Sequence, residues 1–298
     1  MSEKKKKKTG SIAIPFLVTI FIGMILVGGA AFFIYHTFIA HDKDKLKEPQ
    51  PRNGSISVSA DDNHTLLMIL DDPEAGKASS TFLLMRSLPY KKKLLLIGIP
   101  SNSIYYSAEE GGQLVLKDTY ERNGAAAAEE FIENVIGVKI DKYMVFTPEA
   151  FTRTCEIFGG ANFPIDVEFN GFTGDGSVQT LGAEDIRKYI TYNKFSGGES
   201  ERSFKAASVI SYMINGSDGD RIATSFDRYF AEIINMTTLT DITASDYEKY
   251  KSAIKYMFNY GTSISIAMIV DGETAGSDFI PSSDFLRNVP KEYFSDDE

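Results

Sequence analysis

The amino-acid sequence predicts an α/β domain with a mixed central sheet flanked by helices on both faces, preceded by one transmembrane helix. Three observations carry this prediction. Short, nearly continuous apolar runs follow one another in the first third of the chain, segments with helical spacing dominate the rest, and a long uncharged segment stands near the amino terminus. Short apolar runs are typical of strands buried on both faces, and helices on both sides of a sheet provide that burial.

The uncharged segment predicts a membrane anchor. Residues 12–35 contain 24 residues without a charge, and as a helix they would extend over ~36 Å, enough for a hydrocarbon layer of ~30 Å. An apolar region of this length exceeds the ~7–15 residues of a cleaved signal peptide. Lys4 to Lys8 precede it, which places the amino terminus in the cytoplasm and the rest of the chain outside, in a single-pass protein of the plasma membrane. The predicted organisation is a basic tail (1–11), an anchor (12–39), a polar linker (40–62) and an extracytoplasmic domain (63–298).

The first half of this domain contains the clearest element boundaries. Three apolar runs, 65–70, 81–88 and 93–99, predict strands. Residues 125–136 are rich in helix formers and end at Gly137, where a carboxyl-terminal cap belongs. A second helix is expected after Thr147, a good N-cap followed by Pro148, and before Gly159 and Gly160.

The second half alternates less clearly. We predict strands at 164–169 and 263–270, with helices around 182–191, 202–214, 225–236 and 245–258. In the last helix Tyr247, Tyr250, Ile254 and Met257 form one apolar stripe, and core packing is the expected role of such a stripe.

Charge and cysteine content exclude some functions. The chain has 31 Lys and Arg and 41 Asp and Glu, and residues 41–298 have 26 basic and 40 acidic side chains. So acidic a domain argues against nucleic-acid binding, which depends on neutralised phosphates. Cys155 is the single cysteine, so no intramolecular disulfide forms, and we expect it buried on a helix.

One long stretch resembles a known family. Residues 131–167 (FIENVIGVKIDKYMVFTPEAFTRTCEIFGGANFPIDV) follow the pattern of a helix, an "iGi-iDyYv" segment, a second helix, "GGv" and a strand. This order is similar to that of the LytR–CpsA–Psr (LCP) family of bacterial cell-envelope proteins. The apolar runs before it and the helical blocks LGAEDIRKYITY and ERSFKAASVI after it agree with the same family, so the resemblance covers about residues 64–214.

The resemblance implies a phosphotransferase that moves a glycopolymer from a polyprenyl-pyrophosphate carrier to peptidoglycan. Arginines of the family grip the diphosphate, carboxylates hold Mg²⁺, and a long apolar cavity takes the lipid tail. Carried over by residue, the family's first Asp falls on Asp71, its second on Ser80, and the charged pair of its "IPRD" on Ser101 and Asn102. Its "RfR" arginines fall near Thr191 and Asn193, and the two of "GRxxRQ" on Glu199 and Arg202.

Only Asp71 and Arg202 therefore match the family's charged residues. With Asp71 as the one carboxylate, Mg²⁺ would depend largely on water and substrate phosphates. Asp72, Lys194 and Lys205 are the further residues expected to contact a substrate, although a lysine does not reproduce the planar fork of an arginine. Without the resemblance, Asp71 would be interpreted as capping a turn and Arg202 as a solvated surface residue.

Three interpretations follow. The first is a catalytically degenerate family member, a pseudoenzyme that binds a polyprenyl-linked glycan or peptidoglycan, or that scaffolds envelope assembly. The second is an active transferase in which Asp71, Asp72, Lys194 and Arg202 share the work. The third is an unrelated anchored, wall-associated binding module.

Overall fold

The computed structural model describes residues 57–72, 80–107 and 111–295. Among the helices of these residues, none combines the length and the apolar composition that a bilayer crossing requires. The predicted basic tail, the predicted anchor and most of the predicted linker lie outside the described residues.

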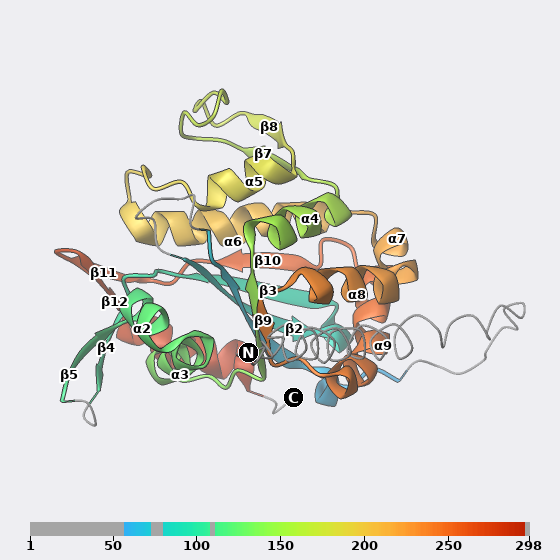
Figure 1. Ribbon diagram of the computed structural model, residues 1–298, viewed down its shortest axis with the longest axis horizontal. Coiled ribbons are helices and arrows are strands. Elements are labelled where there is room, and N and C mark those ends of the chain that lie inside the picture. The colour runs from blue at the N-terminus through green and yellow to red at the C-terminus, as the bar shows by residue number, and fades with distance from the viewer. Residues whose placement is uncertain (1–56, 73–79, 108–110, 296–298) are drawn as a thin grey trace, which may run out of the picture. The chain divides into compact units, whose positions relative to one another are not determined.

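The described residues form a six-stranded sheet in the order β10-β3-β2-β1-β6-β9 (Figure 1). It is mixed, as predicted: β1 pairs antiparallel with β2 and parallel with β6, β2 pairs antiparallel with β3, β10 is parallel to β3, and β9 is antiparallel to β6. Its strands are β1 (His64–Leu70), β2 (Thr81–Leu88), β3 (Lys93–Ile99), β6 (Lys142–Phe146), β9 (Leu239–Thr240) and β10 (Ser265–Met268).

Helices cover both faces, as the sequence predicts. One face packs against α2 (Leu116–Asn123), α3 (Ala125–Ile136) and α10 (Ser283–Val289). The other packs against α4 (Pro148–Phe158), α5 (Ala183–Ile190), α6 (Gly198–Gly216), α7 (Gly219–Thr224), α8 (Phe226–Met236) and α9 (Ala244–Tyr260). Three hairpins complete the fold: β4 (Ile104–Ser107) with β5 (Gly112–Val115), β7 (Ala161–Pro164) with β8 (Val178–Leu181), and β11 (Gly272–Ala275) with β12 (Asp278–Pro281). Short turns of helix are η2 (Ala60–Asp62), η4 (Pro89–Lys91) and η5 (Pro290–Phe294).

Local chemistry accounts for the best-defined boundaries. The hydroxyl of Thr147 accepts a hydrogen bond from the amide of Ala150 at 3.1 Å, and Pro148 occupies the first position of α4. Gly159 ends α4, and Gly137 ends α3, both with left-handed φ, which glycine adopts without a steric cost. Cys155 is fully buried on α4, as expected.

Two strand predictions need correction. Residues 165–169 do not continue a strand, because β7 ends at Pro164 and the chain then turns. The amide of Ile165 donates to Ser177, and the amide of Gly176 donates back to Ile165, which closes the β7–β8 hairpin. The strand predicted at 263–270 is shorter, and only Ser265–Met268 pairs with β3.

The register of β1 positions the candidate site. Leu70 lies opposite Thr81 of β2 and opposite Phe146 of β6. The last residue of β1, the first of β2 and the last of β6 therefore meet at one end of the sheet. Polar residues that follow β1 and β6 are brought together there.

Candidate functional site

A polar cleft of about 1280 Å³ lies at the end of the sheet where β1 and β6 finish. Its lining includes Asp71 and Asp72 after β1, and Thr147 and Glu149 at the start of α4. From α5, Glu184 and Arg187 line it as well. The sequence prediction that Asp71 and Asp72 belong to one site is consistent with this placement.

Asp71 and Asp72 interact with different layers of the molecule. The hydroxyls of Ser80 and of Tyr120, on α2, donate to Asp71 at 3.4 Å each. Burial raises the pKa of Tyr120, and the adjacent Asp71 adds to that rise. Asp72 is buried and forms an ion pair with Arg187 of α5. The two carboxylates therefore have different partners, Asp71 on the side of α2 and Asp72 on the side of α5.

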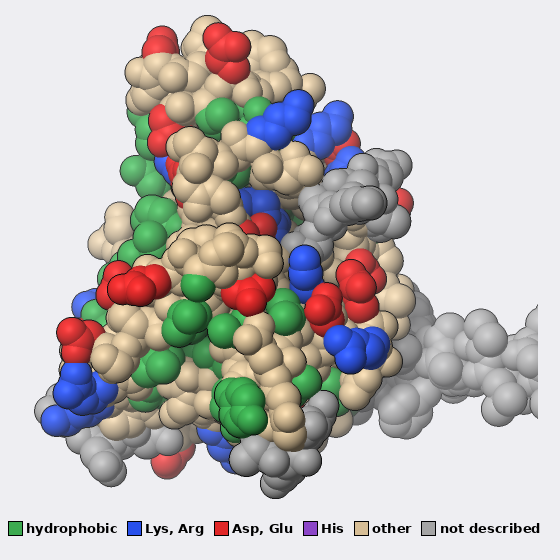
Figure 2. Space-filling view, turned by 90° about the vertical axis from the view of Figure 1, so that its left-hand side faces the viewer, with side chains coloured by type: hydrophobic (Ala, Val, Ile, Leu, Met, Phe, Trp, Pro, Cys, Tyr) green, Lys and Arg blue, Asp and Glu red, His purple; other side chains and the backbone are tan. Residues whose placement is uncertain are grey.

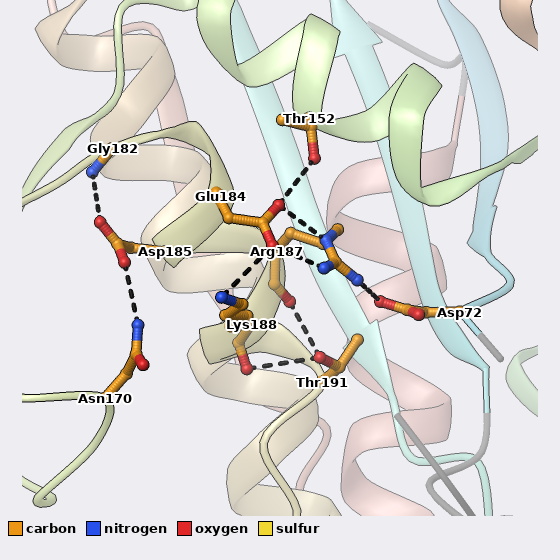
Figure 3. A network of polar contacts seen from close by, with 9 residues as sticks. All are labelled: Asp72, Thr152, Asn170, Gly182, Glu184, Asp185, Arg187, Lys188 and Thr191. Carbon is orange, nitrogen blue, oxygen red and sulfur yellow. Dashed lines mark hydrogen bonds and ion pairs between the residues drawn. The ribbon is translucent and has the colours of Figure 1, made fainter. Parts of the chain in front are cut away.

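Arg187 was not among the residues predicted from the sequence. Figure 3 shows it between two carboxylates, with Asp72 on one side of the guanidinium and Glu184 on the other. Glu184 accepts from Arg187 at 2.6 and 3.0 Å, and this guanidinium lowers the pKa of Glu184 to about 2. Arg187 is only 6% exposed. Its charge is therefore balanced within the protein.

A sequence signal for Arg187 exists. Ala183, Ile186, Arg187 and Ile190 fall at i, i+3, i+4 and i+7, the spacing of the face that α5 buries. An arginine on the apolar stripe of a helix requires a buried partner. Only the fold supplies that partner, because Asp72 lies 115 positions earlier in the chain.

Arg202 is buried and fully hydrogen-bonded. It is 2% exposed, so the interpretation of a solvated surface residue is wrong. Its guanidinium donates at 2.7 Å to the hydroxyl of Thr81 and at 2.8 Å to the carbonyl of Ile190. It also forms a bidentate ion pair with Glu199, whose carboxylate accepts the amide of Ser101 at 3.1 Å as well. Glu199 therefore neutralises Arg202 within the protein.

The two lysines expected to contact a substrate are placed elsewhere. Lys205 pairs with Asp166, and Lys194 is exposed after the end of α5. Neither lysine lines the cleft, and Arg202 does not line it either. Of the five residues proposed from the sequence, the fold brings Asp71 and Asp72 together and leaves Arg202, Lys194 and Lys205 outside the cleft lining.

The charge of the cleft is predominantly acidic. Among its described lining residues are six carboxylates and two guanidiniums. The second guanidinium, of Arg153, donates to Glu232 at 2.6 Å and to Glu156 at 2.7 Å. On the face drawn in Figure 2, Lys and Arg side chains are interspersed with Asp and Glu and form no continuous basic patch.

The residues present do not fit a magnesium site made by the protein alone. Within residues 57–72, 80–107 and 111–295, no three His, Cys, Asp or Glu side chains gather at a distance that could hold a metal ion. Asp72 is paired with Arg187, whereas Asp71 is exposed. A role for Mg²⁺ stays a prediction.

A second, apolar cavity of about 240 Å³ lies between the sheet and α4, α6, α8 and α9. It follows β1 from His64 to Met68 and β6 from Lys142 to Phe146, a length of roughly 13 Å at the rise of a strand. The stripe of Tyr247, Tyr250, Ile254 and Met257, expected to pack in the core, lines this cavity. Phe146 lines both the cavity and the polar cleft.

Comparisons with known proteins agree with the fold. No protein-family profile matches the chain. It is 21% identical over 266 residues to the polyisoprenyl-teichoic acid–peptidoglycan teichoic acid transferase TagU of Bacillus licheniformis, which covers 86% of each chain. The crystal structure of Bacillus subtilis TagV superimposes with a TM-score of 0.58 at 17% identity, over 77% of this chain and 94% of that one.

A ligand-bound structure shares the fold as well. TagT bound to LIIa-WTA superimposes with a TM-score of 0.59 at 15% identity, over 85% of this chain and 94% of that chain. The chain therefore has the fold of these solved structures, and the comparisons support the LCP family resemblance that its sequence indicates.

Proposed function

We propose that the chain is an anchored, extracytoplasmic LCP protein of the bacterial cell envelope that binds a polyprenyl-linked glycan without transferring it. The lipid would occupy the apolar cavity, and the glycan and phosphate would lie in the polar cleft. Glycan acceptors such as peptidoglycan would approach the same cleft.

The geometry of the two spaces supports binding of an amphiphile. Phe146 lines both the apolar cavity and the polar cleft, so a molecule with an apolar tail and a polar head that extended past this residue would contact both. The cavity volume of about 240 Å³ is close to the lower limit of small-ligand sites, roughly 300 Å³. Met68, Met85, Met144 and Met213 are among its lining residues, and methionine adapts readily to irregular apolar ligands.

The internal pairing of the arginines is the observation that supports a binding protein over a transferase. Arg187 pairs with Asp72 and Glu184, and Arg202 pairs with Glu199. Transfer from a diphosphate needs preorganised cations at the developing charge, and loss of one such contact typically costs 10²–10³ in rate. Here both guanidiniums are already bound to carboxylates of the same chain.

An active transferase is the second candidate. Asp71 retains the family's first acidic position and is exposed in the cleft. The TagU relative is named as a transferase, and the similarity covers 86% of this chain. A substrate bringing its own phosphate-bound magnesium would supply the charge that the cleft lacks.

Lipid retention tests the proposed binding. Residues 57–298 purified without detergent are expected to retain an isoprenoid lipid that solvent extraction and mass spectrometry identify. Ile254→Trp would fill the cavity from α9 and should abolish retention. Ser252→Trp, at an exposed position of the same helix, is the matched control. Equal retention by both variants would contradict binding in this cavity.

A transfer assay separates the two candidates. Polyprenyl pyrophosphate with Mg²⁺ is expected to remain intact in the presence of the binding protein. Cleavage that requires Mg²⁺ and is lost in Asp71→Asn would support the transferase and refute the binding proposal. The lipid-retention assay stays informative in both cases, because either candidate binds the lipid.

We further propose that residues 12–39 anchor the chain in the plasma membrane with its amino terminus in the cytoplasm. Protease added outside intact spheroplasts should then degrade residues 57–298. Protection of that domain from external protease would contradict this topology.

A further inference from the structure

A cluster of lysine and tyrosine side chains lies at the end of the sheet opposite the polar cleft. It consists of Tyr90, Lys91 and Lys92 in the turn between β2 and β3, Lys93 at the start of β3, and Tyr256 and Tyr260 on the last turns of α9. We call it the Lys–Tyr surface. Figure 1 shows α9 at the lower right, far from the β7–β8 hairpin at the top. The ammonium of Lys92 lies 5.6 Å from the centre of the Tyr256 ring, which lies 5.1 Å from that of Tyr260. Turn and helix therefore form one continuous surface.

These side chains are accessible. Tyr260 is 61% exposed, Lys91 and Lys93 are exposed, and Tyr90, Lys92 and Tyr256 are partly exposed. Exposed tyrosines next to lysines have no role in the core of the domain. Tyrosine is enriched at membrane–water interfaces, where its ring lies at the level of the lipid headgroups.

The charge of this surface is opposite to that of the domain. Residues 57–298 have 22 basic and 37 acidic side chains, whereas residues 88–93 and 255–260 together have four lysines and no acidic residue. Of these four lysines, Lys255 forms an ion pair with Asp227 of α8. In η2, which contacts the turn between β2 and β3, Asp62 accepts the amide of Ser59 at 2.9 Å. Asp61 is the other acid of η2. A basic region on so acidic a domain would direct the domain toward an anionic partner.

The position of the Lys–Tyr surface, close to where the chain enters the domain, indicates a membrane as the anionic partner. The turn between β2 and β3 lies beside the start of β1, since Ser87 is paired with His64. The chain that precedes β1 leads back to the uncharged segment, and residues 36–56, which separate that segment from residue 57, number 21. Fully extended, they reach about 70 Å at most, and a flexible chain of that length has an r.m.s. span of roughly 25 Å. The described chain therefore begins at the same end of the sheet as the Lys–Tyr surface, so the linker to the predicted anchor leaves the domain at that end.

The apolar cavity reaches the same end of the sheet. His64, Lys142, Tyr250 and Lys251 are among its lining residues there. A domain with this end against a bilayer would present the cavity to the lipid phase and the polar cleft to the wall. This placement of the cavity and of the cleft is consistent with a ligand that comes from the membrane.

We propose that the Lys–Tyr surface binds anionic phospholipid headgroups and orients the domain on the membrane. This rests on the anchoring part of the proposed function, not on lipid binding in the cavity. Lysines near an anionic leaflet are attracted to its negative surface potential. The three consecutive lysines should together favour the bound orientation by roughly tenfold or more, reduced by repulsion from the acidic remainder of the domain.

The test measures the distance of this surface from the bilayer in the full chain. Because Cys155 is fully buried, a cysteine introduced at exposed Asn259 can be labelled selectively with a fluorophore. The chain is reconstituted in phosphatidylcholine vesicles with or without phosphatidylglycerol, both containing a lipid with a spin label on its headgroup. Val178→Cys, 66% exposed on β8, is the matched control site.

Quenching at position 259 is expected to exceed that at position 178 only when phosphatidylglycerol is present, and to fall with salt. Replacing Lys91, Lys92 and Lys93 together by Gln should remove roughly nine-tenths of the excess quenching. Replacing Lys117, Lys188 and Lys194, which lie toward the other end of the sheet, should leave it unchanged. The salt titration of the unsubstituted chain gives the same information without any lysine substitution.

Two results would overturn the proposal. Equal quenching at positions 259 and 178 in phosphatidylglycerol vesicles would show that the surface does not face the bilayer. A fluorescence change at position 259 with soluble polyphosphate but not with these vesicles would show that an anionic polymer is the partner instead. Flotation of the chain with the vesicles tests the anchor by itself, so a failed anchor is distinguished from a failed docking surface.

Discussion

The two faces of the central sheet are packed differently, although they share the same strands. On the face toward α3, Leu67, Ile69, Phe82 and Leu84 are all 0% exposed. On the face toward α6 and α9, Leu66 and Met68 of the same strand β1 stay partly accessible and line the apolar cavity. One face is a filled core, and the other is partly hollow.

The difference distinguishes a densely packed face, which stabilises the domain, from a face with space for a ligand. Interiors are normally packed as densely as organic crystals, so a persistent cavity costs contacts that its lining atoms could have made. The small residues Ala125 and Ala128 let α3 pack closely against the sheet. On the other face, methionine and aromatic side chains leave the space open, which is consistent with a site for an apolar ligand.

The largest expected effect on stability concerns Gly98, on the partly hollow face of the sheet that packs against α6 and α9. Gly98 of β3 packs against α6, where an added Cβ would lie 1.8 Å from the carbonyl oxygen of Ser203. Gly98→Ala should therefore force α6 from the sheet and destabilise the domain by about 3 kcal/mol or more in urea unfolding. Gly112→Ala meets no atom within 4 Å and is the control. Equal stability of the two variants would mean that α6 does not approach the sheet this closely.

Two adjacent leucines compare the faces directly. Leu67→Ala removes a fully buried side chain from the filled face and should cost about 3 kcal/mol. Leu66→Ala enlarges a cavity that already exists and should cost about 1 kcal/mol. Urea unfolding of both variants, with the same substitution in the same strand, measures the difference. Similar losses would show that both faces are filled in solution.

The ion pair at the cleft end of the hollow face should contribute less. Glu199→Gln leaves the buried Arg202 without its charged partner and should lower the free energy of unfolding by about 2 kcal/mol. Glu201→Gln, on the same turn of α6, is the matched control. Were Arg202 to face a bound phosphate instead, Glu199→Gln would increase the affinity for inorganic phosphate, which equilibrium dialysis detects.

The smallest effect concerns pH. Arg187 lowers the pKa of Glu184 from 4.5 to about 2, so the stabilisation is complete above pH 4.5 and is lost as the pH falls toward 2. Glu184 is half exposed, so solvent screening keeps the effect small. Thermal unfolding between about pH 5 and pH 2.5 should therefore depend less on pH in Glu184→Gln than in the unsubstituted chain. An identical pH dependence in both would contradict the pairing.

The fold was largely predictable because its boundaries depend on local signals. The apolar runs that form β1, β2 and β3 are bounded by charged or turn residues, and Thr147, Pro148, Gly137 and Gly159 mark helix ends through their own backbone preferences. The strand predicted at 164–169 was wrong because alternating apolar residues there satisfy a hairpin turn rather than a ladder.

The site was predictable only in part, because its charges are paired over long sequence distances. Asp71 and Asp72 could be placed by following a strand. The pairing of Arg187 with Asp72 spans 115 positions and that of Arg202 with Thr81 spans 121, so neither is encoded in a local pattern. The cavity was equally hidden, because Ile254 and Met257 have the same spacing in a filled core as in a cavity wall.

Phe146 lines both the apolar cavity and the polar cleft. A ligand confined to one space would not contact the other, whereas a long amphiphile would cross the boundary at this ring. Selectivity among ligands would then depend on the length of the apolar part that precedes the polar part. The position of Phe146 would then favour ligands whose apolar part ends, and whose polar part begins, at this residue.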